Sequence, residues 1–184
     1  MQSEAPSSIE LDTFRSSNTS PTPPHFPSPS PSPSPSPLLY LVIYNISKSN
    51  NIKDLIQTAM SFSAMQILVV GAPKLDSALL TDIPHKRFQN LPECATYITL
   101  TLKADLVGVE IMEDKTKCFN IDTLPFTRDT AFMLGNEGSG MNEKQLAICD
   151  YFVYISQFGH GTASLNVNVA AGVVLQRFDD WRRR

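Results

Sequence analysis

Short apolar runs alternate with longer amphipathic segments along most of the chain. Runs of about four to eight apolar residues are typical of buried strands, whereas apolar positions that recur every three or four residues indicate helices. Strands are predicted at residues 39–44, 66–70, 106–112, 130–134 and 151–155. Helices are predicted at residues 51–63, 93–103, 142–148 and 165–181. This alternation predicts an α/β fold with a mainly parallel sheet flanked by helices.

The first predicted helix, residues 51–63, begins within NNIKDLIQTA. Its apolar residues form one stripe that is suited to core packing. Asn50 or Asn51 is expected to cap this helix, and Asp54 is expected in its first turn, where the helix dipole favours a negative charge. Gln57 lies off the apolar stripe, which by itself is typical of an ordinary surface residue.

Residues 1–37 differ from the rest of the chain in composition. They contain 10 of the 14 prolines, mostly in a Ser-Pro alternation that starts after Phe26. Such a segment has little to bury and favours extended conformations. We therefore expect a disordered tail at 1–37 and one compact domain at 38–184. Three acids against the single base Arg15 argue against an organellar transit peptide.

The predicted domain has a nearly balanced charge. Without the tail's three acids and Arg15, 14 Lys and Arg remain against 15 Asp and Glu, a net charge of −1. This balance does not by itself indicate nucleic-acid binding. Two basic groups, residues 85–87 and Arg177 with residues 182–184, are candidates for phosphate contacts, although solvated charges are the simpler interpretation.

The three cysteines have neither metal-type nor redox-type spacing. Cys94, Cys118 and Cys149 are therefore predicted to be reduced thiols of an intracellular protein. No apolar run approaches the length of a membrane span, so we expect a soluble protein without a membrane partner. A cytoplasmic or nuclear location is predicted, and an organelle is not excluded.

Glycines and polar residues follow three of the predicted strands, at residues 45–51, 135–140 and 156–166. The carboxyl ends of parallel strands meet at one edge of a sheet, which is where ligands bind in such folds. The sequence therefore predicts a small-molecule site at this edge.

The segment LGNEGSGM, residues 134–141, is neither a P-loop nor a dinucleotide fingerprint, because its spacing and residues differ from both. Its glycines permit positive φ and close approach to a ligand. Glu137 is suited to accept hydrogen bonds from a ligand or from the loop itself. A simple turn from strand to helix explains the pattern equally well.

The segment GHGTASLNVNVAAGVVL, residues 159–175, predicts a well-buried helix with small residues that allow close packing. Ser164 and Asn166 stand at its start, where free N–H groups favour a polar ligand. Helix capping would explain one of these two residues. His160, between two glycines, is a further candidate.

These two segments and NNIKDLIQTA together resemble the SpoU/TrmH-type branch of the SPOUT RNA methyltransferases. That family has an Asn-led first motif, a second close to LGNEGSG and a third close to SLNVSVAA, in this order, and the resemblance covers about residues 39–181. It implies a deep C-terminal trefoil knot, a rare exception among protein folds. It also implies S-adenosyl-L-methionine as the cofactor and tRNA or rRNA as a partner methylated at a ribose 2′-hydroxyl. The family works as a homodimer in which the first-motif and C-terminal helices meet.

The resemblance assigns site residues one by one. Cofactor contacts are implied at Gly135, Ile155 and Leu165. Catalytic positions are implied at Asn51, Glu137, Ser164 and Asn166, and no metal is expected. Ser164 and Asn166 would orient the ribose, whereas Glu137 would order the loops or anchor a basic partner. A ribose hydroxyl is a poor nucleophile at neutral pH, so the reaction needs a base or stabilisation of the developing oxyanion.

The first motif departs from the family pattern at one position. The family has its main catalytic arginine six residues after the motif asparagine, and counting from Asn51 this position is Gln57. Loss of one preorganised stabilising group commonly costs about 10²- to 10³-fold in rate. Ser63 also stands where the family often has a glycine. Two functions therefore remain open: an RNA methyltransferase, or a catalytically silent SPOUT protein that binds RNA, the cofactor or a protein partner.

Overall fold

The computed structural model describes residues 36–73, 75–159 and 164–184. The predicted tail lies outside the described residues except for its last two positions, and so does His160. Within the described ranges, no helix is long and apolar enough to cross a membrane.

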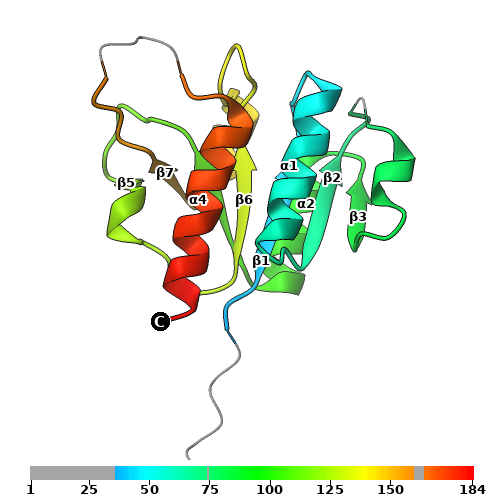
Figure 1. The fold of residues 1–184 in the computed structure, drawn as a ribbon, viewed down its shortest axis with the longest axis horizontal. Coiled ribbons are helices and arrows are strands. Elements are labelled where there is room, and N and C mark those ends of the chain that lie inside the picture. The colour runs from blue at the N-terminus through cyan, green and yellow to red at the C-terminus, as the bar shows by residue number, and fades with distance from the viewer. Residues whose placement is uncertain (1–35, 74, 160–163) are drawn as a thin grey trace, which may run out of the picture. The chain divides into compact units, whose positions relative to one another are not determined.

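Seven described strands form one sheet in which every pairing is parallel (Figure 1). The order across the sheet is β3-β2-β1-β6-β4-β7-β5. The strands are β1 (Leu39–Ile43), β2 (Gln66–Val70), β3 (His85–Phe88), β4 (Asp105–Val109), β5 (Cys118–Asn120), β6 (Thr130–Leu134) and β7 (Tyr151–Tyr154). The predicted α/β class with a parallel sheet is confirmed.

Helices cover both faces of the sheet. On one face lie α1 (Ser49–Ser61) and α4 (Val167–Arg182), which pack side by side (Figure 1). The other face carries α2 (Leu91–Thr96), the π-helix η2 (Tyr97–Leu102) and α3 (Glu143–Ile148). Two short 3₁₀ helices, η1 (Ser77–Leu80) and η3 (Ile121–Thr123), complete the elements of the described residues. The protein is therefore a three-layer structure.

Alternate residues of the strands fill two separate cores. In β1, Leu41 and Ile43 pack beneath α1 and α4, whereas Tyr40 and Val42 face α2 and η2. Phe178 of α4 packs against Phe132 of β6, with ring centroids 5.5 Å apart. This contact fixes the C-terminal helix to the centre of the sheet.

The two strands at the edges of the sheet, β3 and β5, were not predicted. Edge strands have one unpaired side and less burial, so they need not contain apolar runs. His85, Lys86 and Arg87 of β3 are exposed, and only Phe88 is buried. The predicted strand 106–112 is also too long, because β4 ends at Val109 and the chain then turns away from the sheet.

The start of α1 differs from the prediction. Lys48 is its N-cap, without a capping hydrogen bond from its side chain, so the expected cap at Asn50 or Asn51 is wrong. Both asparagines lie within the helix, and Asp54 lies beyond its first turn. At the start of α4 the capping interpretation is right, because the Asn166 side chain accepts a hydrogen bond from the backbone N–H of Asn168 at 2.9 Å.

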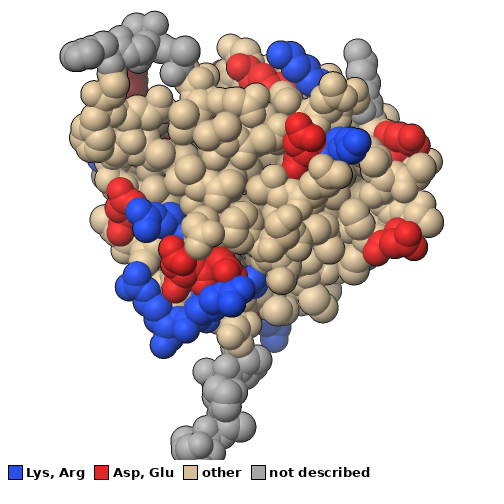
Figure 2. Space-filling view, viewed as in Figure 1, with Lys and Arg blue, Asp and Glu red and all other residues tan. Residues whose placement is uncertain are grey.

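The arginines near the C-terminus pair mainly with acids of the same domain. Arg182 and Arg183 both contact Asp179, at 2.7 Å each, and Arg177 contacts Asp122 at 2.8 Å. Figure 2 shows acidic and basic groups mixed at this end of the molecule, whereas much of the surface over α1 and α4 carries no charge. The simpler interpretation, structural and solvated charges, therefore fits this group.

The three cysteines are buried and free. Burial raises the pKa of the Cys94 and Cys149 thiols to about 12, so both are neutral at physiological pH. Free thiols agree with the prediction, and the intracellular location stays a prediction.

Candidate functional site

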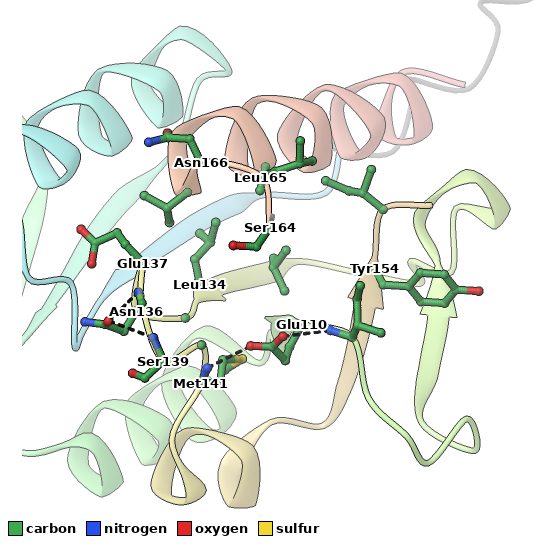
Figure 3. A pocket seen from close by; sticks show the side chains of 18 of the residues that line it. Glu110, Leu134, Asn136, Glu137, Ser139, Met141, Tyr154, Ser164, Leu165 and Asn166 are labelled. Carbon is green, nitrogen blue, oxygen red and sulfur yellow. Dashed lines mark hydrogen bonds between the residues drawn. The ribbon is translucent and has the colours of Figure 1, made fainter. Parts of the chain in front are cut away.

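A cavity of about 970 Å³ opens at the carboxyl ends of β4, β6 and β7 (Figure 3). Its size is near the upper end of the range of ligand pockets. All seven predicted site residues line it, namely Asn51, Gly135, Glu137, Ile155, Ser164, Leu165 and Asn166. The three motifs, which are far apart in the sequence, therefore converge on one cavity.

The loop after β6, residues 135–141, is held compact by its own backbone. Asn136 and Gly140 exchange two backbone hydrogen bonds of 2.8 and 2.9 Å. The Asn136 Oδ1 atom accepts two more, from the backbone N–H of Gly138 at 2.9 Å and of Ser139 at 3.3 Å. The loop is therefore a closed turn that presents its backbone to the cavity.

Gly135 has no room for a side chain. A Cβ atom there would lie 2.6 Å from the carbonyl carbon of Gly140 and 2.6 Å from the nitrogen of Met141. Gly140 itself has φ of +69°, a conformation that L-residues with side chains rarely adopt. Glycine is thus required at both ends of the turn for steric reasons.

Glu137 connects this loop to the start of α1. Its carboxylate accepts hydrogen bonds from the backbone N–H groups of Ser47 and Lys48, at 3.1 and 3.2 Å, and from the Asn51 side chain at 2.7 Å. Desolvation by itself would raise the pKa of Glu137. These hydrogen bonds and one from its own backbone together have a larger, opposite effect, so the pKa lies below its usual value. Glu137 is therefore an ionised residue that orders two loops.

Asn51 uses both ends of its side-chain amide for contacts within the protein. Its Nδ2 atom donates to Glu137, and its Oδ1 atom accepts a longer hydrogen bond from Asn168 Nδ2 at 3.4 Å. The side chain is 9% exposed. Asn51 thus links the first, second and third motifs and fixes their relative positions.

Three residues at the site were missed by sequence reasoning, and two of them bridge loops. Asn136 Nδ2 donates to the Asn45 carbonyl at 3.0 Å and to Ser47 Oγ at 2.6 Å. Gln145, which is fully buried, donates to the Leu134 carbonyl at 3.2 Å and accepts from Asn45 Nδ2 at 3.1 Å. The capping pair of Asn142 and Gln145 at the start of α3 was the only available signal for Gln145.

Glu110 is the third missed residue, and it follows β4 directly. Its carboxylate accepts hydrogen bonds from the backbone N–H of Met141 at 2.9 Å and of Ile111 at 3.1 Å. Figure 3 shows Glu110 beside Met141 at the wall of the cavity. Glu110 therefore supports the second-motif loop from the side opposite to Glu137, a contact between residues 31 apart that no local pattern reveals.

The third-motif residues form the opposite wall. Ser164, Leu165 and Asn166 come just before α4, and Figure 3 shows Ser164 across the cavity from Glu110 and Met141. Asn166 Oδ1 is used in the cap of α4. Capping and cavity lining are therefore compatible roles for Asn166.

Gln57 lies away from this cavity. It is exposed on α1 and is not among the lining residues. Its carbonyl accepts a hydrogen bond from Ser61 Oγ at 2.9 Å. The presence of Gln57 where the family has an arginine therefore does not alter the cavity wall of the same chain.

The cavity combines apolar walls with charged groups. Apolar lining comes from the ends of the strands and from both motif loops, and includes Val109, Leu134, Met141, Leu146, Ile155 and Leu165. Four carboxylates and one ammonium group also line it, from Glu110, Glu113, Asp114, Glu137 and Lys48. Such a lining suits a ligand with an apolar part and a positively charged part.

Residues 38–176 match the model of the SpoU rRNA Methylase family. A 23S rRNA (guanosine-2′-O-)-methyltransferase, RlmB, of Neisseria meningitidis is 32% identical over 148 residues, which are 74% of this chain and 56% of that protein. An uncharacterized tRNA/rRNA methyltransferase of Mycolicibacterium smegmatis is 30% identical over 156 residues, 79% of this chain and 47% of that protein. The chain spans about half the length of these two relatives.

Solved structures share the fold. The SpoU methyltransferase AviRb from Streptomyces viridochromogenes, in complex with the cofactor AdoMet, has a TM-score of 0.69 and 24% identity, covering 82% of this chain and 63% of that chain. A TrmH/SpoU tRNA modifying enzyme of A. aeolicus has a TM-score of 0.61 and 17% identity, covering 79% and 75%.

Proposed function

The chain belongs to the SpoU rRNA Methylase family, and from this premise we propose that it is an S-adenosylmethionine-dependent RNA methyltransferase that acts on a ribose 2′-hydroxyl of tRNA or rRNA. The proposal rests mainly on the convergence of three distant motifs on one cavity of about 970 Å³. The Neisseria meningitidis relative is named as a guanosine-2′-O-methyltransferase, which supports this reaction type.

The lining of the cavity fits the cofactor. Gly135 lines the cavity where the turn after β6 closes on itself without room for a side chain, and Ile155 and Leu165 supply apolar contacts. Nearby carboxylates suit a ligand that carries a sulfonium and an ammonium group. The bound cofactor would supply an electrophilic methyl group. Gly135, Ile155 and Leu165 are therefore the residues that we expect to hold it.

Glu137 and Asn51 hold other parts of the site in place. Glu137 already accepts three hydrogen bonds from the start of α1, so its role is to hold the loops around the cavity and not to remove a proton. Asn51 likewise uses both ends of its side-chain amide in hydrogen bonds within the protein. Both are expected to be positioning residues whose loss displaces the cavity walls.

Ser164 and Asn166 are placed to orient the ribose. The Ser164 hydroxyl can both accept from and donate to a sugar hydroxyl. Asn166 uses its Oδ1 atom in the cap of α4, which leaves its amide donors for a ligand oxygen. Both side chains are exposed at the cavity, where an RNA nucleotide can reach them.

We further propose that the chain forms a homodimer through α1 and α4. The middle of their shared outer surface carries few charges (Figure 2), and Val169 of α4 is 52% exposed. The trefoil knot stays a prediction, since residues 160–163, between β7 and α4, lie outside the described residues. A cytoplasmic or nuclear location likewise stays a prediction.

Gln57 favours a second candidate function. A neutral glutamine cannot replace the charge of the family's arginine. The alternative is a catalytically silent SPOUT protein that binds RNA, the cofactor or a protein partner.

Two measurements on the full chain test these functions. Titration calorimetry with S-adenosylmethionine should give saturable heat, with ATP as a control ligand that gives none. Transfer of a labelled methyl group to total cellular RNA then separates the two functions. Binding without transfer would favour the silent protein, and no heat up to millimolar cofactor would overturn the cofactor proposal.

A further inference from the structure

The charges that line the cavity are unevenly distributed. Glu110, Glu113 and Asp114 follow β4 in one continuous segment. Lys48 comes from the start of α1, together with Asn51 and next to Glu137. Among the lining residues in the described part of the chain, Lys48 is the one that carries a positive charge. The cavity therefore has an acidic side after β4, and a side at the start of α1 where its one cation lies next to the Glu137 carboxylate.

The backbone of Lys48 is firmly placed. Its N–H group donates to Glu137 Oε1 at 3.2 Å, and the preceding residue, Ser47, donates through its N–H to Glu137 Oε2 at 3.1 Å. Asn136 Nδ2 also donates to Ser47 Oγ at 2.6 Å. The residue is thus fixed at its Cα atom by the loop that follows β6.

The side chain of Lys48, in contrast, is exposed and free to reach a ligand. Its ammonium group has no salt bridge or hydrogen bond to another described residue. The Glu137 carboxylate accepts hydrogen bonds from Ser47, Lys48 and Asn51 N–H groups, and forms no salt bridge with the Lys48 ammonium group among the described residues. The ammonium group is therefore available for an anion from outside the protein.

A polyanion and a cationic cofactor would prefer opposite sides of such a cavity. The carboxylates after β4 repel phosphate groups and attract a sulfonium or ammonium group, whereas Lys48 attracts phosphate. The RNA backbone is consequently expected to enter between the start of α1 and the third-motif wall. Ser164 and Asn166, which we expect to orient the ribose, belong to that wall.

We propose that Lys48 binds a backbone phosphate of the substrate RNA at the mouth of the cavity, and so supplies the positive charge that Gln57 lacks. This inference rests on the proposed function for the identity of the substrate. Gln57 lies nine residues further on, roughly 13 Å along the helix axis at the usual rise per residue, and outside the cavity wall. Lys48 is therefore the better-placed residue of this chain for a phosphate next to the cavity.

RNA binding by the full chain, measured without cofactor, tests this role. The probe is a short single-stranded RNA oligonucleotide, titrated at several salt concentrations. Lys48→Met should weaken binding about threefold to tenfold, the range expected for one hydrogen bond of ordinary net strength. The slope of log K against log salt should fall by about 0.7, the value for one lost phosphate contact with a single strand.

Two further variants complete the test. Lys48→Arg keeps the charge and should retain most of the affinity and the salt slope. Lys144→Met removes an exposed lysine of α3, which neither lines the cavity nor belongs to the proposed dimer helices, and should leave both quantities unchanged. Equal affinities and slopes for Lys48→Met and Lys144→Met would overturn the assignment.

The RNA titration tests the role of Lys48 separately from the proposed methyltransferase function. The RNA titration contains no cofactor, so it decides the role of Lys48 whether or not methyl transfer occurs. In an active protein, Lys48→Met should raise KM for RNA and leave the calorimetric affinity for S-adenosylmethionine unchanged. A normal KM for RNA in this variant would contradict the phosphate contact even if the enzyme is active.

Discussion

Asn51 of α1 donates a 2.7 Å hydrogen bond to the carboxylate of Glu137, a residue 86 positions later in the chain. This contact joins the Asn-led motif to the glycine-rich loop after β6. Because Asn168 donates to the other end of the same amide, the third motif is included in the connection. These polar residues of the motifs therefore hold the cavity walls together through contacts within the protein, which require no ligand.

Replacing Asn51 by Asp should destabilise the protein. The substitution turns the donor that faces Glu137 into a second carboxylate, and the free energy of unfolding should fall by about 1–3 kcal/mol through a lost buried hydrogen bond and like-charge repulsion. Urea denaturation at neutral pH measures the change. Asn50→Asp adds the same charge at an exposed neighbouring position, where the helix dipole favours it, and should cause no loss. Equal stability of the two variants would contradict the role of Asn51.

The contribution of Glu137 to stability should depend on pH. Its pKa in the folded protein is lowered, because hydrogen bonds from its own backbone, Asn51, Ser47 and Lys48 outweigh desolvation. A lowered folded pKa means that the contribution is fully present above the ordinary value of 4.5 and is lost as the pH falls through the folded value. The difference in unfolding free energy between the native protein and Glu137→Gln should therefore be constant near neutrality and shrink below about pH 4.5. A pH-independent difference would show that the ionised carboxylate is not what holds the loops.

Gly135→Ala should distort the loop after β6 and weaken the proposed cofactor site. The new Cβ atom would lie 2.6 Å from backbone atoms of Gly140 and Met141, so the loop must shift. We expect a loss of about 1–3 kcal/mol in stability, as for other overpacked sites, and calorimetric affinity for S-adenosylmethionine lower by about tenfold or more.

The matched variant for stability is Gly138→Ala in the same loop. There the nearest atom, Asn136 Oδ1, would be 3.7 Å from the added Cβ, so the free energy of unfolding should change by less than about 0.5 kcal/mol. A Gly135→Ala protein that is as stable as Gly138→Ala and binds the cofactor normally would disprove the close-approach role of Gly135.

Gln57→Arg tests what the departure in the first motif means. Gln57 is exposed and outside the cavity wall, so the substitution should leave the free energy of unfolding within about 0.5 kcal/mol of the native value. If position 57 limits catalysis, the rate of methyl transfer should rise by about 10²-fold, the amount that one preorganised stabilising group commonly contributes. Activity that is present in the native chain and unchanged in Gln57→Arg would mean that the site works without this charge.

The positions of the central strands along the chain were predictable because each of them is an apolar run between polar loops. The edge strands β3 and β5 were not, since exposed residues such as His85 and Lys86 carry no burial pattern. The convergence of polar loops at one sheet edge followed from parallel pairing alone. Contacts such as Glu110 with Met141 and Gln145 with Leu134 depend on how distant loops fold back on each other, which no local pattern encodes.

The ends of the helices show the same limit. The rule that asparagine caps helices holds at Asn166 and Asn142, where the side chain bonds its own helix. It fails at Asn51, which lies inside α1 and whose side chain donates to the Glu137 carboxylate of another loop. At the start of α1, a contact between distant residues takes the place of local capping by a side chain.

The most direct test of the central claim is the analysis of RNA incubated with the full chain and S-adenosylmethionine that carries a deuterated methyl group. After digestion to nucleosides, mass spectrometry identifies where the label resides. We predict labelled 2′-O-methylnucleosides with the native chain and none, or about 10²-fold less, with Ser164→Ala. Label confined to a base, or absent from RNA although the cofactor binds, would contradict the claim that this cavity methylates ribose.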